Sequence, residues 1–166
     1  MDNVVLDTSA WLALAESEPG ADEVEAQVAS AWLGRVAIHS SFVSLTELQY
    51  IRTHEQGAES AARLIAWVKQ QPVQWLHSDD ARCSEAAKLK VAHKVSFADA
   101  FVAATAKRCD AVLVHKDPEF DSLKGDMSPS PYPAAPLYKY SGLTPSPLLA
   151  HSRSAHYRRA RQKQIQ

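Results

Sequence analysis

Four acidic residues lie where predicted strands end or predicted helices begin: Asp7, Glu47, Asp99 and Asp117. Asp7 directly follows the β-branched run Val4-Val5-Leu6, and Asp117 follows Val112-Leu113-Val114 after two residues. The other two acids each stand three residues after a serine that can start a helix, in Ser44-Leu45-Thr46-Glu47 and Ser96-Phe97-Ala98-Asp99. From such positions, carboxylates of separate segments can meet in one cleft.

Taken singly, each acid also fits a role in helix capping. A serine followed three residues later by an acid has the spacing of a capping box, in which the acid accepts a free amide of the first turn. Asp117-Pro118 resembles an N-cap followed by proline at the first helical position, and Asp7 before Thr8-Ser9 is also compatible with an N-cap. A structural and a catalytic role are therefore both open for each residue.

Taken together, the four acids predict a metal site. Carboxylates in a small cleft repel one another and raise each other's pKa unless a cation neutralises them. Oxygen ligands favour Mg²⁺ or Mn²⁺ over zinc, and the two cysteines, Cys83 and Cys109, form no zinc-binding pattern. Such an ion lowers the pKa of a water, orients it toward a phosphodiester and stabilises the leaving oxygen. The pattern thus points to metal-assisted phosphodiester hydrolysis.

Strands and helices alternate in the segments that must position these acids. Short apolar runs predict strands at residues 4–6, 36–38, 73–76 and 111–114. Apolar residues at spacings of three and four, with helix-start signals, predict helices at residues 8–17, 21–33, 44–54, 59–70, 78–92 and 96–108. Strands separated by helices imply right-handed crossovers, and hence an α/β fold with a parallel sheet and helices on both faces. If the first and fourth strands are neighbours, their acids meet beyond the carboxyl ends of the strands, where open parallel sheets bind ligands.

Four segments around the acids form a pattern in chain order. They are Val4-Val5-Leu6-Asp7-Thr8-Ser9-Ala10, Ser44-Leu45-Thr46-Glu47-Leu48, Ser96-Phe97-Ala98-Asp99-Ala100-Phe101-Val102-Ala103-Ala104-Thr105-Ala106, and Leu113-Val114-His115-Lys116-Asp117-Pro118-Glu119-Phe120. Together they resemble PIN-domain ribonucleases, and in particular the VapC-type toxins of bacterial toxin–antitoxin pairs. The resemblance runs from about residue 3 to residue 123, and its most specific piece begins at Ser96.

This resemblance implies a PIN-like three-layer α/β/α fold with a short parallel sheet flanked by helices. It implies a Mg²⁺-dependent endoribonuclease, with Mn²⁺ able to replace Mg²⁺, in which Asp7, Glu47, Asp99 and Asp117 are the catalytic and metal-binding acids. The implied substrate is a structured RNA, such as tRNA or rRNA, cut at an exposed single-stranded loop. The implied protein partners are a small antitoxin, one segment of which enters the active site, and a second copy of the chain in a homodimer.

Two features depart from the usual pattern of that family. His115-Lys116-Asp117 stands where members often have Thr-Gly-Asp, so the usual hydroxyl contact at the fourth acid is missing. We interpret His115 as a local hydrogen-bond partner and not as a catalyst. A last short strand is expected after Phe120, but Lys124-Gly125-Asp126-Met127 runs straight into a proline-rich segment.

Length and composition fit one globular domain followed by a tail. The chain has 166 residues, 46% hydrophobic and 22% charged, which excludes general disorder and a collagen-like or disulfide-rich scaffold. Six of the nine prolines fall between residues 128 and 147, and residues 151–166 carry a net charge of +5 against −6 for residues 1–150. We expect a nuclease domain at 1–125 and a poorly ordered Pro/Ser-rich tail with a basic end at 126–166.

The sequence gives no sign of a membrane segment. Its longest uninterrupted apolar run, Ala10 to Ala15, is far shorter than a bilayer span. The start, Met-Asp-Asn-Val-Val, lacks the basic region of a secretory signal. We therefore expect a cytoplasmic protein with no membrane partner.

Two other functions fit parts of the pattern. A PIN-like module that binds RNA or a protein without cutting RNA is suggested by His115-Lys116, the unusual tail and the acidic body. The presence of all four mutually repelling acids argues against it, because a module without catalysis has no need of them. A haloacid-type phosphatase would require a second acid two residues after the first, where Ser9 stands.

Overall fold

A computed structural model describes residues 2–123 and 125 of the chain. The predicted Pro/Ser-rich tail, residues 126–166, lies outside the described residues. The strands are β1 (Asp2–Leu6), β2 (Val36–Ser41), β3 (Val73–Leu76) and β4 (Val112–Val114). The helices are α1 (Thr8–Glu16), α2 (Ala21–Trp32), α3 (Phe42–Gln56), α4 (Ala58–Lys69), α5 (Asp80–Ala92) and α6 (Phe97–Arg108), followed by the 3-10 helix η1 (Pro118–Leu123).

The four strands form one parallel sheet in the order β3-β2-β1-β4. In this order β1 has β2 on one side and β4 on the other, with Val4 opposite both Ile38 and Val112. The condition that the first and fourth strands are neighbours is thus met. The chain leaves β1 in one direction and returns on its other side at β4, so the sheet has its topological switch point there. We call the edge at which all four strands end the carboxyl edge.

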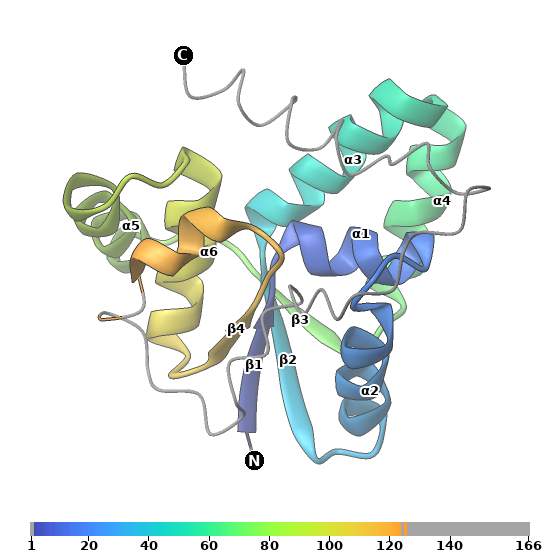
Figure 1. The fold of residues 1–166 in the computed structure, drawn as a ribbon, viewed down its shortest axis with the longest axis horizontal. Helices are drawn as coiled ribbons and strands as arrows, with labels where there is room; N and C mark the ends of the chain where they lie inside the picture. The colour runs from blue at the N-terminus through green and yellow to red at the C-terminus, as the bar shows by residue number, and fades with distance from the viewer. Residues whose placement is uncertain (1, 124, 126–166) are drawn as a thin grey trace.

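Helices cover both faces of the sheet, which confirms the predicted three-layer α/β/α fold (Figure 1). Alternate side chains of β1 face the two layers. Val4 and Leu6 pack into a core built with α1, α2, α3 and α4, whereas Val5 packs into the core of α5 and α6. The central helix α6 lies close to the sheet because its inward residues are small: Ala100, Ala103, Ala104 and Ala106 are all buried. Alanine also has the highest intrinsic helix propensity.

The boundary between β2 and α3 differs from the sequence prediction. The strand was predicted to end at residue 38 and the helix to begin at Ser44, but β2 runs to Ser41 and α3 begins at Phe42. Two serines continue the strand because distant segments of the chain pair with them. Ser40 and Ser41 lie opposite Trp75 and Leu76 of β3, and the buried Ser40 hydroxyl donates to the Leu6 carbonyl at 2.9 Å.

The expected last strand after Phe120 is not found in the part of the chain that the structure describes. Residues 118–123 instead form η1, whose Phe120 and Leu123 side chains are buried in the core beside α6. Pro118 favours this outcome because its ring fixes a helical φ and it lacks an amide for a sheet hydrogen bond. Among residues 2–123 and 125, no helix is both long enough and apolar enough to cross a membrane.

One tryptophan connects the sheet to the α1–α4 layer. Trp11 of α1 is fully buried, and its ring centroid lies 6.4 Å from that of Trp67 and 5.9 Å from that of Trp75. Its indole Nε1 donates to the Ser40 hydroxyl at 2.9 Å. This ring therefore holds α1, α4, β2 and β3 in register, directly behind the carboxyl edge.

We predict that Trp11→Ala lowers the free energy of unfolding by about 3–5 kcal/mol, the cost of emptying a core aromatic site. Trp32→Ala is the matched control, since Trp32 ends α2 with 65% of its surface exposed, and it should change stability by less than about 0.5 kcal/mol. Urea unfolding followed by far-UV circular dichroism measures both. Similar small losses in the two variants would show that Trp11 does not join the layers.

Candidate active site

Asp7 lies at the switch point of the sheet and is fully buried. Its backbone N–H donates to the Val114 carbonyl at 3.1 Å, which continues the β1–β4 pairing by one residue. Its carboxylate caps α1, since Oδ2 accepts from the Ser9 N–H at 3.2 Å and from the Ser9 hydroxyl at 2.8 Å. The other oxygen, Oδ1, is buried and has no hydrogen-bond partner among the described residues. The capping role is thus real, but it uses only one of the two oxygens.

Glu47 is held inside α3 and not at its start. The N-cap of α3 is Ser41, so Ser44 and Glu47 lie within the helix, and a capping-box role for Glu47 is wrong. Its side chain is buried, and its Oε2 accepts from the Thr8 hydroxyl at 2.6 Å. The contact places Glu47 beside the residue that follows Asp7. A buried acid in a helix interior does not cap that helix. The burial of Glu47 therefore favours a role in the candidate site.

Asp99 lies at the position of the acid in a capping box. Ser96 caps α6: its hydroxyl accepts the Asp99 N–H at 3.0 Å and donates to Asp99 Oδ2 at 2.6 Å. The backbone N–H of the capping serine, which the acid accepts in that motif, donates to Glu119 Oε2 at 3.2 Å. Asp99 is fully buried at this helix start.

Asp117 lies at the start of η1, just beyond β4. Its Oδ1 accepts the Glu119 N–H at 2.8 Å, so the predicted N-cap before proline is confirmed. His115 Nδ1 donates to the Asp117 carbonyl at 2.8 Å, and its ring lies 4.8 Å from that of Phe120. His115 is therefore a local hydrogen-bond partner, as interpreted from the sequence.

Hydrogen bonds join the four acids along the carboxyl edge. The Ser9 hydroxyl that donates to Asp7 also accepts the Lys116 N–H at 2.9 Å, which ties Asp7 to the segment of Asp117. Glu119 then connects the start of η1 with the start of α6, and Thr8 connects α1 with Glu47. The acids are nevertheless not packed into one ligand cluster. Within residues 2–123 and 125, no group of three or more His, Cys, Asp or Glu side chains is placed to hold a metal ion.

Two cations near this edge form ion pairs with acids of α1 and the loop after it. Arg52 Nη2 of α3 lies 3.0 Å from Glu16 Oε1, and both side chains are about nine-tenths buried. Lys116 Nζ lies 2.8 Å from Glu18 Oε2. Each pair crosses from the end of α1 to the segment that carries Glu47 or Asp117, and so helps to fix the acidic segments around α1.

The donor set at this edge suits a hard divalent cation. All four side chains offer oxygen, and the buried Asp7 Oδ1, which has no hydrogen-bond partner among the described residues, is available to a cation. Mg²⁺ keeps several waters and takes only one or two carboxylates directly. A site with one direct carboxylate and further acids acting through water therefore fits these residues, although a tight cluster of three is not formed.

Sequence reasoning missed two residues of this network, Thr8 and Glu119. Thr8 directly follows Asp7 and begins the helix predicted at residues 8–17. Glu119 stands two residues after Asp117. Proximity to a candidate acid was the available signal in both cases. Their partners, at sequence separations of 39 and 23 residues, could not be found from local spacing.

Thr8→Val is expected to lower the free energy of unfolding by about 1.5–3 kcal/mol, the range for a hydrogen bond to a charged group. The change keeps the shape of the side chain and removes the donor to Glu47. Thr8→Ser retains the hydroxyl and should recover most of the loss. Urea unfolding of both variants tests this, and a valine variant as stable as the wild type would contradict it.

The sequence matches the family model described as PIN domain over residues 4–126. A search of the curated proteins finds no match. Among solved structures, the chain resembles the sarcin–ricin loop cleaving toxin VapC20 of Mycobacterium tuberculosis, with a TM-score of 0.58 and 19% identity over 71% of this chain and 92% of that one.

Two further similar structures come from toxin–antitoxin systems. VapBC-1 of nontypeable Haemophilus influenzae gives a TM-score of 0.58 and 23% identity, covering 75% of this chain and 94% of that one. VapBC2 of Rickettsia felis, bound to a DNA fragment from its promoter, gives 0.58 and 16%, covering 72% and 91%. At these identities the likeness concerns the fold.

Proposed function

The chain belongs to the PIN domain family, and we propose that it is a metal-dependent endoribonuclease, the toxin of a toxin–antitoxin pair. The observation that carries this proposal is the buried Asp7 carboxylate at the switch point of the sheet, with one oxygen capping α1 and the other lacking a hydrogen-bond partner among the described residues. A cap explains the first oxygen and not the second. A cation at Oδ1 explains the second.

In this proposal Asp7 is a direct ligand of Mg²⁺, or of Mn²⁺ in its place. Glu47, Asp99 and Asp117 complete the site directly or through water. When bound, the ion supplies a water of lowered pKa and positive charge for the leaving oxygen. The hydroxyls of Ser9, Thr8 and Ser96 each donate to one of the acids and hold its carboxylate in a fixed orientation. These neutral donors add no charge that would compete with a cation.

RNA is the proposed substrate, and a small antitoxin the proposed protein partner. The similar VapC20 is a toxin that cleaves the sarcin–ricin loop, and a similar structure from Klebsiella pneumoniae is a toxin–antitoxin complex. We extend both properties to this chain, and with them the homodimer that the family resemblance implies. The acidic body gives little long-range attraction for RNA, so recognition is expected to depend on contacts close to the carboxyl edge.

Cleavage of labelled total bacterial RNA by the purified, antitoxin-free protein tests the proposal. We predict discrete products with Mg²⁺, none with EDTA, and a loss of at least about 100-fold in Asp7→Asn and Asp99→Asn, because changes even outside the ligand set cost metal sites about 10–100-fold. Asp22→Asn is the matched control. It removes the same charge from an exposed position in the first turn of α2 and should cleave like the wild type.

Two results would contradict the proposal. Cleavage that survives in both Asp7→Asn and Asp99→Asn would place the active site elsewhere. A folded wild-type protein that cuts no RNA with any divalent metal would instead favour the RNA- or protein-binding module. Mapping the ends of any products identifies the RNA target.

A further inference from the structure

Glu119 joins the two helix starts that carry the last two acids. Its backbone N–H donates to Asp117 Oδ1 at 2.8 Å, and its Oε2 accepts the Ser96 N–H at 3.2 Å. Ser96 caps α6 and binds Asp99 through its hydroxyl at 2.6 Å. A single residue thus connects, through its backbone N–H and its side chain, the acid after β4 with the residue that orients the acid of α6.

Glu119 contacts the same group that a capping box uses. Asp99 is the third residue of α6, the position whose carboxylate accepts the N–H of the capping serine in that motif. Because Glu119 accepts the Ser96 N–H, this amide has an acceptor that does not depend on Asp99. The Ser96 hydroxyl then orients the Asp99 carboxylate.

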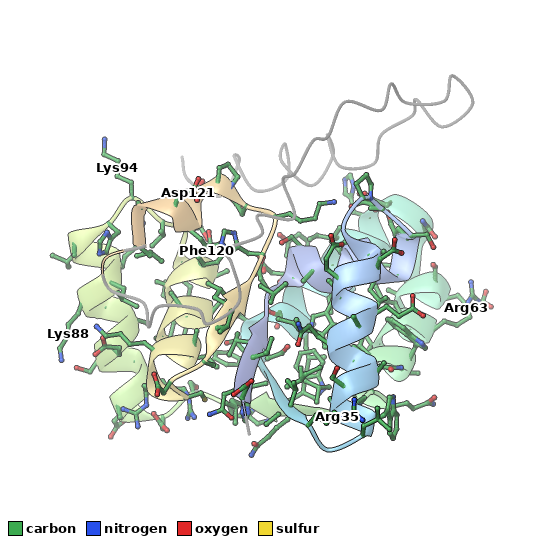
Figure 2. All side chains as sticks on the ribbon, turned by 60° about the horizontal axis from the view of Figure 1, so that its bottom comes forward. Arg35, Arg63, Lys88, Lys94, Phe120 and Asp121 are labelled. Atoms are coloured by element: carbon green, nitrogen blue, oxygen red, sulfur yellow. The ribbon has the colours of Figure 1, made fainter. Side chains whose placement is uncertain are left out.

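The backbone that carries Glu119 is anchored by its neighbours in η1. The next residue, Phe120, is buried in the core beside α6, whereas Asp121 is exposed; Figure 2 shows the two labelled on η1. Leu123 is also fully buried, and the Ser122 hydroxyl donates to the Glu119 carbonyl at 2.9 Å. Movement of the Glu119 backbone would therefore require η1 to leave the core.

We propose that Glu119 is a positioning residue that sets Asp99 relative to Asp117, and that it acts as a hydrogen-bond acceptor and not as a charge. This inference rests on the proposed function and deepens it. A glutamine at this position keeps an acceptor oxygen at the same reach and removes the charge. An alanine removes both. The two substitutions therefore separate positioning from direct metal binding.

We predict that Glu119→Ala weakens Mn²⁺ binding and lowers kcat for RNA cleavage by about 10–100-fold, the usual cost of losing a group that orients a metal ligand. KM should change little, because the proposed role of Glu119 is to orient Asp99 and not to bind RNA. Glu119→Gln should stay close to the wild type in both measurements. Asp121→Asn removes a charge from the same 3-10 helix without altering this contact, and it should also resemble the wild type.

Hydrogen exchange of the Ser96 amide provides a readout that needs neither metal nor RNA. Its exchange should be faster in Glu119→Ala and unchanged in Glu119→Gln. Amide exchange and Mn²⁺ affinity, the latter by calorimetry, decide on Glu119 even if the wild type cuts no RNA, so failure of the nuclease proposal is recognised separately. Equal losses in Glu119→Ala and Glu119→Gln would overturn the proposal in favour of a charged metal ligand. Unchanged Mn²⁺ affinity and kcat in Glu119→Ala would overturn it outright.

Discussion

The burial of one carboxylate, that of Asp7, constrains the whole carboxyl edge. Its position is set by β1, which lies between β2 and β4, and by α1, which starts directly after it. Removing a carboxylate from water is costly unless both oxygens find partners. Ser9 provides for one oxygen and no described residue hydrogen-bonds to the other. The fold thus leaves a buried carboxylate oxygen at its switch point to which a cation can bind.

Neutral donors orient the acids around Asp7. Asp7, Glu47 and Asp99 each accept a serine or threonine hydroxyl at 2.6–2.8 Å, whereas Arg52 and Lys116 pair with Glu16 and Glu18. A hydroxyl fixes the direction of a carboxylate and leaves its charge in place. The ion pairs then hold α1 against the neighbouring segments. The same edge thus combines fixed geometry with negative charge, as a divalent metal site requires.

The sequence predicted the elements that depend on local patterns and missed the contacts that join distant segments. Short apolar runs and helix-start signals located all four strands and six helices, and Asp7 and Asp117 follow β1 and β4 as the sequence predicted. The start of α3 was misplaced because Ser40 and Ser41 look like loop residues, although Trp11 and Leu6 satisfy the buried Ser40 hydroxyl. The contact of Glu119 could not be predicted from the sequence for a similar reason. Its partner, Ser96, lies 23 residues away on another helix.

The most direct test of this account is the position of Mn²⁺ in crystals of the protein, located by its anomalous scattering. The account predicts a peak within about 2–2.5 Å of Asp7 Oδ1, the range of ligand distances for hard divalent cations. Asp7→Asn crystals grown in the same solution should lose that peak. A Mn²⁺ ion bound away from Asp7, or an Asp7 Oδ1 that contacts only protein atoms in the presence of Mn²⁺, would contradict the central claim.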